Sequence, residues 1–136
     1  MIIGVGTDII EVKRIRAAIA KNERFVTRVY TPAEIAYCQQ KSRPELSFAA
    51  RFAAKEAVSK AFGTGIGKIG WLDMEITNEQ SGQPIVHLSG KCAMIAQEKR
   101  IKAIHLTLSH TEEYAVATAI LEGGNYNVSS NSTTDA

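Results

Sequence analysis

Hydrophobic positions along this 136-residue chain follow a helical spacing in some segments and a strand-like alternation in others. The helical spacing, together with capping and turn residues, predicts helices over residues 11–20, 23–29, 31–40, 45–62 and 90–100. Alternating or continuous apolar runs predict strands over residues 2–8, 72–77, 85–88, 104–109 and 114–121. Helices and strands mixed in this order indicate an α+β fold.

The length and the composition indicate one domain, which we place at residues 1–122, with a core formed from the 45% of residues that are hydrophobic. Residues 123–136 are mostly Asn, Ser, Thr and Gly, so we expect a disordered tail there. Cys38 and Cys92 lack metal-ligand spacing and are interpreted as core thiols in a reducing compartment. Because no run resembles a signal peptide or a membrane span, we expect a cytoplasmic protein without membrane contact.

The segment Arg51-Phe-Ala-Ala-Lys-Glu-Ala-Val-Ser-Lys60 carries the densest group of charged side chains. Around a helix, its alanines form one apolar arc, and the opposite face is predicted to be polar, with Arg51, Lys55, Glu56, Ser59 and Lys60. Two interpretations remain open. Glu56 and Lys60 suit a surface ion pair, or they contact a metal ion and phosphate. Phe52 on the polar face favours the second, because a ligand or another subunit would cover it.

A glycine-rich run, Gly63-Thr-Gly-Ile-Gly67, follows this helix. One glycine suffices to end a helix. The additional glycines favour close approach of the backbone to a ligand, since they carry no side chain. Gly63 and Gly65 are therefore candidate contacts of a phosphate-containing ligand.

Two further side chains, Asp8 and His110, each allow a structural and a functional interpretation. Asp8 follows an apolar strand, where a carboxylate needs a partner. It has the spacing of an N-cap for helix 11–20, or it binds a hard cation together with Glu56, since Mg²⁺ commonly takes one or two carboxylates. His110 is either a turn residue or a donor to a phosphate oxygen.

Positive charge is concentrated near the start of the chain, although the net charge is only +2. Residues 13–28 contain six basic residues and one acidic residue. The alternatives are a solvated helix face and a docking surface for an acidic partner, where charge raises the association rate. Nucleic acid is disfavoured, because the patch is short and no recognition motif is present. The candidate docking residues are Arg14, Lys21, Arg24, Phe25 and Arg28.

Four segments together are similar to the holo-acyl-carrier-protein synthases, a family of small 4′-phosphopantetheinyl transferases. They occur in the family's order over residues 1–121: Ile3-Gly-Val-Gly-Thr-Asp-Ile-Ile-Glu11, the run from Arg51 to Gly65, Ser81-Gly-Gln-Pro84, and Leu108-Ser-His-Thr-Glu-Glu-Tyr-Ala115. The resemblance implies an antiparallel sheet packed against a long central helix, in a homotrimer with active sites between subunits. It also implies Mg²⁺-dependent transfer of the phosphopantetheine arm of coenzyme A to a serine of apo acyl carrier protein, in support of fatty acid biosynthesis.

The resemblance also assigns roles to the candidate residues, position by position. Asp8 and Glu56 correspond to metal ligands, Lys60 to the diphosphate contact, and Arg51 and His110 to contacts near the ribose phosphate of coenzyme A. The docking residues correspond to the surface that receives the acidic second helix of the carrier protein. Glu56 is also a candidate general base. The alternative function is a non-catalytic module that binds coenzyme A, nucleotide phosphates or an acidic helix.

Overall fold

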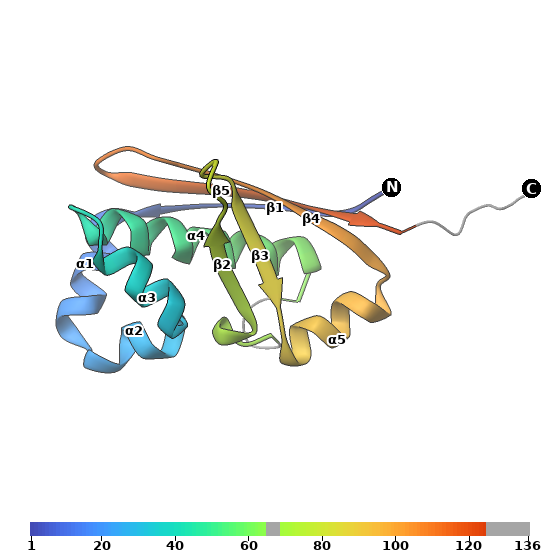
Figure 1. Ribbon diagram of the computed structural model, residues 1–136, viewed down its shortest axis with the longest axis horizontal. Helices are drawn as coiled ribbons and strands as arrows, with labels where there is room; N and C mark the ends of the chain where they lie inside the picture. Colours follow the sequence, from blue (N-terminus) through green and yellow to red (C-terminus); the bar gives the residue numbers. More distant parts are fainter. Residues whose placement is uncertain (65–68, 125–136) are drawn as a thin grey trace, which may run out of the picture.

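The computed structural model describes residues 1–64 and 69–124, and one long helix runs along a sheet in it (Figure 1). The helices are α1 (Val12–Lys21), α2 (Glu23–Val29), α3 (Pro32–Gln39), α4 (Pro44–Phe62) and α5 (Gly90–Glu98), with one 3-10 turn, η1 (Trp71–Asp73). The strands are β1 (Ile2–Glu11), β2 (Met74–Asn78), β3 (Pro84–Leu88), β4 (Ile101–His110) and β5 (Tyr114–Gly123). The predicted α+β class is confirmed. Every predicted helix and strand is present, with the ends of α2 as predicted and at least one end of each of the others shifted.

The structure tests several local predictions. The helix predicted from residue 31 starts with a capping box, in which the side chains of Thr31 and Glu34 each accept from the other's backbone N–H group. Gly123, which the sequence assigned to the tail, ends β5 instead, where it pairs with Ile101. Residues 125–136 of the predicted tail, and Gly65, lie outside the described residues. Both cysteines are free and buried, as predicted, and no described helix is long and apolar enough to cross a membrane.

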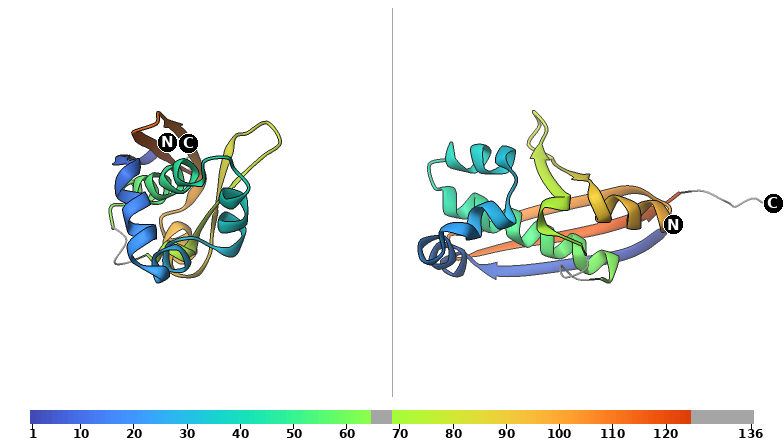
Figure 2. Two further views of the ribbon diagram at one scale, coloured as in Figure 1. Left: turned by 90° about the vertical axis from the view of Figure 1, so that its left-hand side faces the viewer. Right: turned by 90° about the horizontal axis from the view of Figure 1, so that it is seen from below.

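The strands form two antiparallel sheets, one of order β1-β5-β4 and one of order β2-β3. α4 lies lengthwise against one face of the three-stranded sheet, while α1, α2 and α3 cluster at one end (Figure 2). The inward side chains of β5 are mostly alanines and are buried. Such small side chains allow the helix to lie close to the sheet.

β1 and α4 are in contact through their backbones at two glycines. A Cβ at Gly4 would overlap the carbonyl oxygen of Ala61, and a Cβ at Gly6 would overlap that of Ala57. Only residues without a side chain fit at these positions. Residues two apart on a strand lie on the same face. Because Gly6 faces α4, the side chain of Asp8 points toward α4 as well.

The prediction of an open polar face on α4 is wrong for three of the five residues assigned to it, because their side chains are buried. Arg51, Lys55 and Ser59 are only 3%, 0% and 1% exposed. The sheet covers one side of α4, and α1, α3 and β2 contact it elsewhere. Most of these buried polar groups have partners inside the protein, for example Lys55 with Glu34. A helical wheel does not reveal this arrangement, because it shows no neighbouring element.

Phe52 is covered by its own chain. Its ring stacks on Trp71 at 4.9 Å between centroids and on Phe25 at 6.1 Å. A ligand or another subunit is therefore not needed to explain its place beside charged residues, contrary to the expectation from sequence.

Candidate active site

Asp8 and Lys60 are brought together by the close contact of β1 and α4. Nζ of Lys60 lies 3.1 Å from Oδ1 of Asp8 and donates to the carbonyl oxygen of Thr7 at 3.1 Å. The side chains of Asp8 and Lys60 are 16% and 53% exposed. Asp8 lies within β1 and the N-cap of α1 is Glu11. The N-cap interpretation of Asp8 is therefore wrong.

Glu56 lies one helical turn before Lys60 and interacts with both members of this pair. Burial, and next the negative charge of Asp8, raise the pKa of Glu56, while the charge of Lys60 opposes the rise. Lys60 pairs with Asp8, and no Glu56–Lys60 ion pair is formed within the described residues. Two carboxylates and one ammonium group, distant in sequence, thus share one site.

This donor set fits a hard divalent cation. Carboxylate oxygens are the ligands that Mg²⁺ prefers, and it commonly uses only one or two of them. A cation between Asp8 and Glu56 would remove the repulsion that contributes to the raised pKa of Glu56. The described residues contain no cluster of three or more His, Cys, Asp or Glu suited to a metal. Water or a substrate phosphate would therefore complete the coordination shell.

Gly63 ends α4 near this site. Its φ of 78° is left-handed, and its N–H bonds the carbonyl oxygens of Ser59 and Lys60, as expected of a helix cap. Apart from its neighbours in the chain, no described residue has an atom within 4 Å of the position that a Cβ would occupy there. The backbone at Gly63 is therefore open to a ligand.

Arg51 and His110 do not join this group within one chain. Arg51 precedes Lys60 by nine positions, which is a rotation of about 180° around a helix at ~100° per residue. Its guanidinium lies 4.1 Å from the ring centroid of Tyr37 and donates to Asn78, and its Nε is buried without a partner. His110 lies on β4, which β5 separates from β1. The predicted site residues thus form two groups on different sides of α4.

His110 borders a cationic pocket of about 360 Å³. Lys41 and Arg43 contribute cations, and two serines contribute hydroxyl groups; the full lining is Tyr37, Lys41, Ser42, Arg43, Leu46, Ser47 and His110. This composition suits a phosphate group. Lys41 and Arg43 were missed from sequence, because they approach His110 only when the turn after β4 lies over the start of α4.

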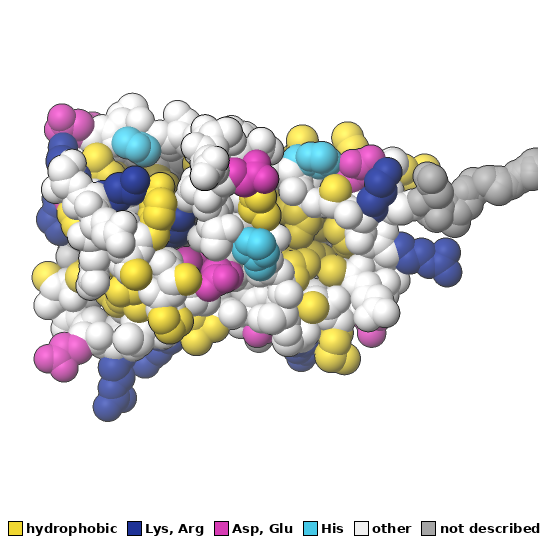
Figure 3. Space-filling view, viewed as in Figure 1, with side chains coloured by type: hydrophobic (Ala, Val, Ile, Leu, Met, Phe, Trp, Pro, Cys, Tyr) yellow, Lys and Arg dark blue, Asp and Glu magenta, His cyan; other side chains and the backbone are white. Residues whose placement is uncertain are grey.

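The four candidate docking cations, Arg14, Lys21, Arg24 and Arg28, lie exposed on α1 and α2. None of them forms an ion pair with a described residue, whereas the neighbouring Lys13 and Arg16 do. Lys and Arg side chains project from the end of the molecule formed by these helices (Figure 3). Phe25 is half-buried against Phe52 and presents only part of its ring.

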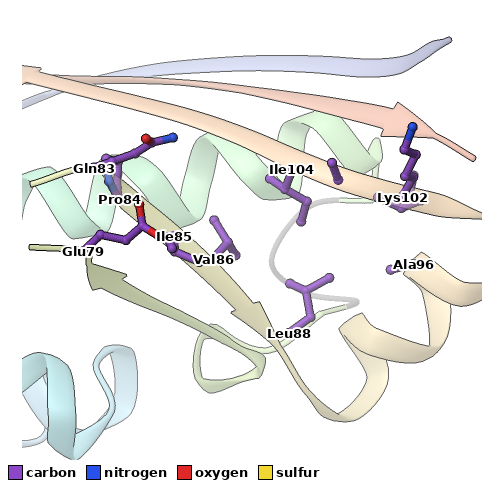
Figure 4. A pocket seen from close by; sticks show the side chains of 11 residues that line it. Glu79, Gln83, Pro84, Ile85, Val86, Leu88, Ala96, Lys102 and Ile104 are labelled. Atoms are coloured by element: carbon purple, nitrogen blue, oxygen red, sulfur yellow. The ribbon is translucent and has the colours of Figure 1, made fainter. Parts of the chain in front are cut away.

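A separate apolar groove of about 440 Å³ lies between β3 and β4 (Figure 4). Ile85, Val86, Leu88 and Ile104 form its floor, with Lys102 at the rim. None of the predicted site residues lines it. Its location therefore does not bear on the carboxylate site.

Comparison with known proteins identifies the family to which this arrangement belongs. Residues 4–119 match the 4′-phosphopantetheinyl transferase superfamily. The chain belongs to this superfamily. It is 52% identical over 124 residues to the holo-[acyl-carrier-protein] synthase of Koribacter versatilis, which covers 90% of this chain and 99% of the relative. It is 49% identical over 117 residues to that of Moorella thermoacetica, which covers 86% of this chain and 91% of the relative.

Solved structures agree with the sequence comparison. The holo-(acyl-carrier-protein) synthase of Bacillus anthracis, in complex with CoA (3′,5′-ADP), superposes with a TM-score of 0.77 at 40% identity, covering 91% of this chain and 99% of that one. The Helicobacter pylori synthase, in complex with coenzyme A, has a TM-score of 0.76 at 29% identity, covering 87% and 99%. The fold predicted from the resemblance, an antiparallel sheet on a long helix, is therefore shown.

Proposed function

We propose that this chain transfers the 4′-phosphopantetheine group of coenzyme A to a serine of apo acyl carrier protein, releasing adenosine 3′,5′-bisphosphate. The observation that carries the proposal is the Asp8–Glu56–Lys60 group in a member of the phosphopantetheinyl transferase superfamily. A non-catalytic phosphate binder is less well supported, because it would need cations more than two carboxylates.

The three site residues have distinct proposed roles. Asp8 and Glu56 would hold Mg²⁺, which when bound neutralises charge on the diphosphate oxygens. Lys60 contacts the diphosphate, since its ammonium group is exposed beside the carboxylates. Glu56 is also the candidate general base for the serine hydroxyl, directly or through a water molecule. In phosphoryl transfer, positioning and charge stabilisation account for most of the catalysis.

A second copy of the chain would complete the site. Arg51 and His110 lie on a different side of α4 from Lys60, so two adjoining copies would together supply the predicted contacts of one coenzyme A molecule. The outer face of β1 exposes Ile3, Val5 and Ile9 at 42%, 60% and 63%, and a neighbouring subunit would cover such a surface. A contact between two different surfaces closes into a ring, for which we propose a trimer.

Mixing two inactive variants tests the shared site. Glu56→Gln removes the carboxylate group of one surface, and His110→Ala removes the phosphate contact of the other. If each site takes the two residues from different copies, mixed oligomers contain some intact sites, and activity returns on mixing at low coenzyme A. Activity that stays at the sum of the separate variants would place both residues in one chain.

The exposed cations of α1 and α2 are proposed to dock the carrier protein. Arg14, Lys21, Arg24 and Arg28 have no described acidic partner, unlike Lys13 and Arg16, so an acidic helix would supply the missing counter-charges. No described ion pair of these four side chains would have to break before the carrier protein docks.

Mass spectrometry of the carrier protein tests the transfer itself. The protein is incubated with coenzyme A, Mg²⁺ and a panel of apo acyl carrier proteins. A carrier that gains the mass of the phosphopantetheine arm is the expected result. If every carrier keeps its mass while coenzyme A still binds, the non-catalytic alternative is correct.

A further inference from the structure

Lys55 and Glu34 form an ion pair inside the protein that the proposed transfer does not use. Both side chains are buried, and Nζ of Lys55 lies 2.7 Å from Oε1 of Glu34. The same Nζ donates to the carbonyl oxygens of Val29 at 2.6 Å and of Trp71 at 3.0 Å. An ammonium group has three donors, so all of them are satisfied, each by a different element.

Glu34 extends this cluster to two more backbone groups. Its Oε1 accepts from the N–H of Thr31 at 2.8 Å, and its Oε2 accepts from the N–H of Ile76 at 2.7 Å. Two side chains therefore join α4 to the end of α2, the start of α3, η1 and β2. We call this set the Lys55 cluster: Val29, Thr31, Glu34, Lys55, Trp71 and Ile76.

Stability alone does not account for the Lys55 cluster. Removing two charges from water is costly, and apolar residues of similar volume often stabilise a core as well or better. Short, directional bonds to one ammonium group have a different effect. They fix the separation of the elements that carry the acceptors, because each bond weakens steeply when its geometry changes.

The elements joined by the cluster carry the two ends of the proposed reaction. Lys55 directly precedes Glu56 on α4, and α2 carries three of the candidate docking residues. Phe52 lies one turn before Glu56 and stacks between Phe25 of α2 and Trp71 of η1. Lys55 bonds the backbone of both flanking elements. The cluster thus holds α2 and η1 on either side of the helix that presents Glu56.

We propose that Lys55 is a positioning residue for the carrier protein. This inference rests on the proposed function. By holding the end of α2 against α4, Lys55 sets the spacing between the docking cations and the carboxylates of Asp8 and Glu56. The serine of a docked carrier then reaches those carboxylates. Among the candidate contacts of coenzyme A, Lys60 and His110 are not part of the Lys55 cluster. Arg51 lies one turn before Lys55, but Asn78 and Tyr37 hold its guanidinium. We therefore expect loss of Lys55 to affect the carrier protein more than coenzyme A.

The double variant K55M/E34Q tests the proposal. Lys55→Met alone would leave the Glu34 carboxylate buried without a counter-charge, which is destabilising. Adding Glu34→Gln removes that charge and keeps an acceptor for the backbone N–H groups. With apo acyl carrier protein and coenzyme A, we expect kcat/KM for the carrier to fall at least about tenfold, while KM for coenzyme A changes by less than about twofold.

Two controls separate positioning from a general loss of stability. Leu121→Ala shortens a buried side chain on β5, away from the cluster, and should lower Tm without raising KM for the carrier. Lys55→Arg keeps the charge beside Glu34, but its planar guanidinium cannot replace the compact three-donor ammonium. It should show the same selective loss, and it decides the question if the double variant does not fold.

Folded variants with parent values for the carrier protein would overturn the proposal. An equal loss for both substrates would overturn it too, because it would indicate a structural role only. If the parent protein modifies no carrier at all, the proposed function fails and the role of Lys55 is not at issue.

Discussion

Gly6 of β1 lies directly against the backbone of Ala57 on α4, with no room for a Cβ between them. This contact sets the position of the proposed catalytic residues, because Asp8 follows Gly6 on the same strand face and Glu56 precedes Ala57. The separation of the two carboxylates therefore depends on how closely the strand and the helix approach.

Gly6→Ala should damage both stability and activity. The added methyl group overlaps the Ala57 carbonyl oxygen, so β1 must move away from α4. Overpacking of this kind costs about 1–3 kcal/mol, and the displacement separates Asp8 from Glu56. Urea unfolding and kcat measured on the folded fraction check both effects. Gly70→Ala is the matched control, since a Cβ there meets only ordinary contacts, and it should leave both values near those of the parent.

Removing either carboxylate should abolish most of the turnover without unfolding the protein. Asp8→Asn and Glu56→Gln keep the shape of the side chain but remove a charge that the cation and the diphosphate chemistry need. We expect kcat to fall by at least about 100-fold at saturating Mg²⁺, with circular dichroism unchanged. Near-normal turnover in either variant would contradict the metal assignment.

The raised pKa of Glu56 predicts a pH-dependent stability of the metal-free protein. Its pKa is higher in the folded than in the unfolded state, so ionisation of Glu56 opposes folding as the pH rises through the folded pKa. Below the unfolded pKa the group is protonated in both states and this effect disappears. Glu56→Gln should therefore be more stable than the parent at pH 8 and close to it at pH 4.

Thermal melts of both proteins in EDTA across this pH range measure that difference, and a constant difference would refute the prediction. Mg²⁺ competes with the proton at Glu56, so its stabilisation of the parent should also grow from pH 5 to pH 8. The Glu56→Gln protein should show little of this growth.

Charge reversal on α1 should weaken carrier docking and spare coenzyme A binding. Arg14 is exposed and has no described acidic partner, so Arg14→Glu places a negative charge where we propose that an acidic helix docks. We expect KM for the carrier to rise about tenfold at low salt, with a smaller rise at high salt. Lys91→Glu makes the same charge change on α5 and serves as the control. A matching rise of KM for coenzyme A in Arg14→Glu would show that the docking assignment is wrong.

Much of the fold was predictable because its signals are local. The capping residues Thr31 and Glu34 identified the start of α3, and strand-like alternation or helical spacing of apolar residues identified the other helices and strands. The 3-10 turn η1 was not predicted, and its last two residues had been assigned to the next strand. The sequence also identified Asp8, Glu56 and Lys60 as candidate site residues. An acid in an apolar strand needs a partner, and the two charged residues lie close to a glycine-rich turn.

Other features depend on contacts between distant segments, and only the tertiary structure decided them. Local periodicity predicted Lys55 and Arg51 on an open polar face, but the sheet and the surrounding elements bury both. The ion pair of Lys60 with Asp8 rather than Glu56, and the separation of His110 from that pair, likewise follow from the order β1-β5-β4 and the glycine contact of β1 with α4. The spacing of hydrophobic residues predicts which face of a helix or strand is buried, but it does not predict which other element packs against that face.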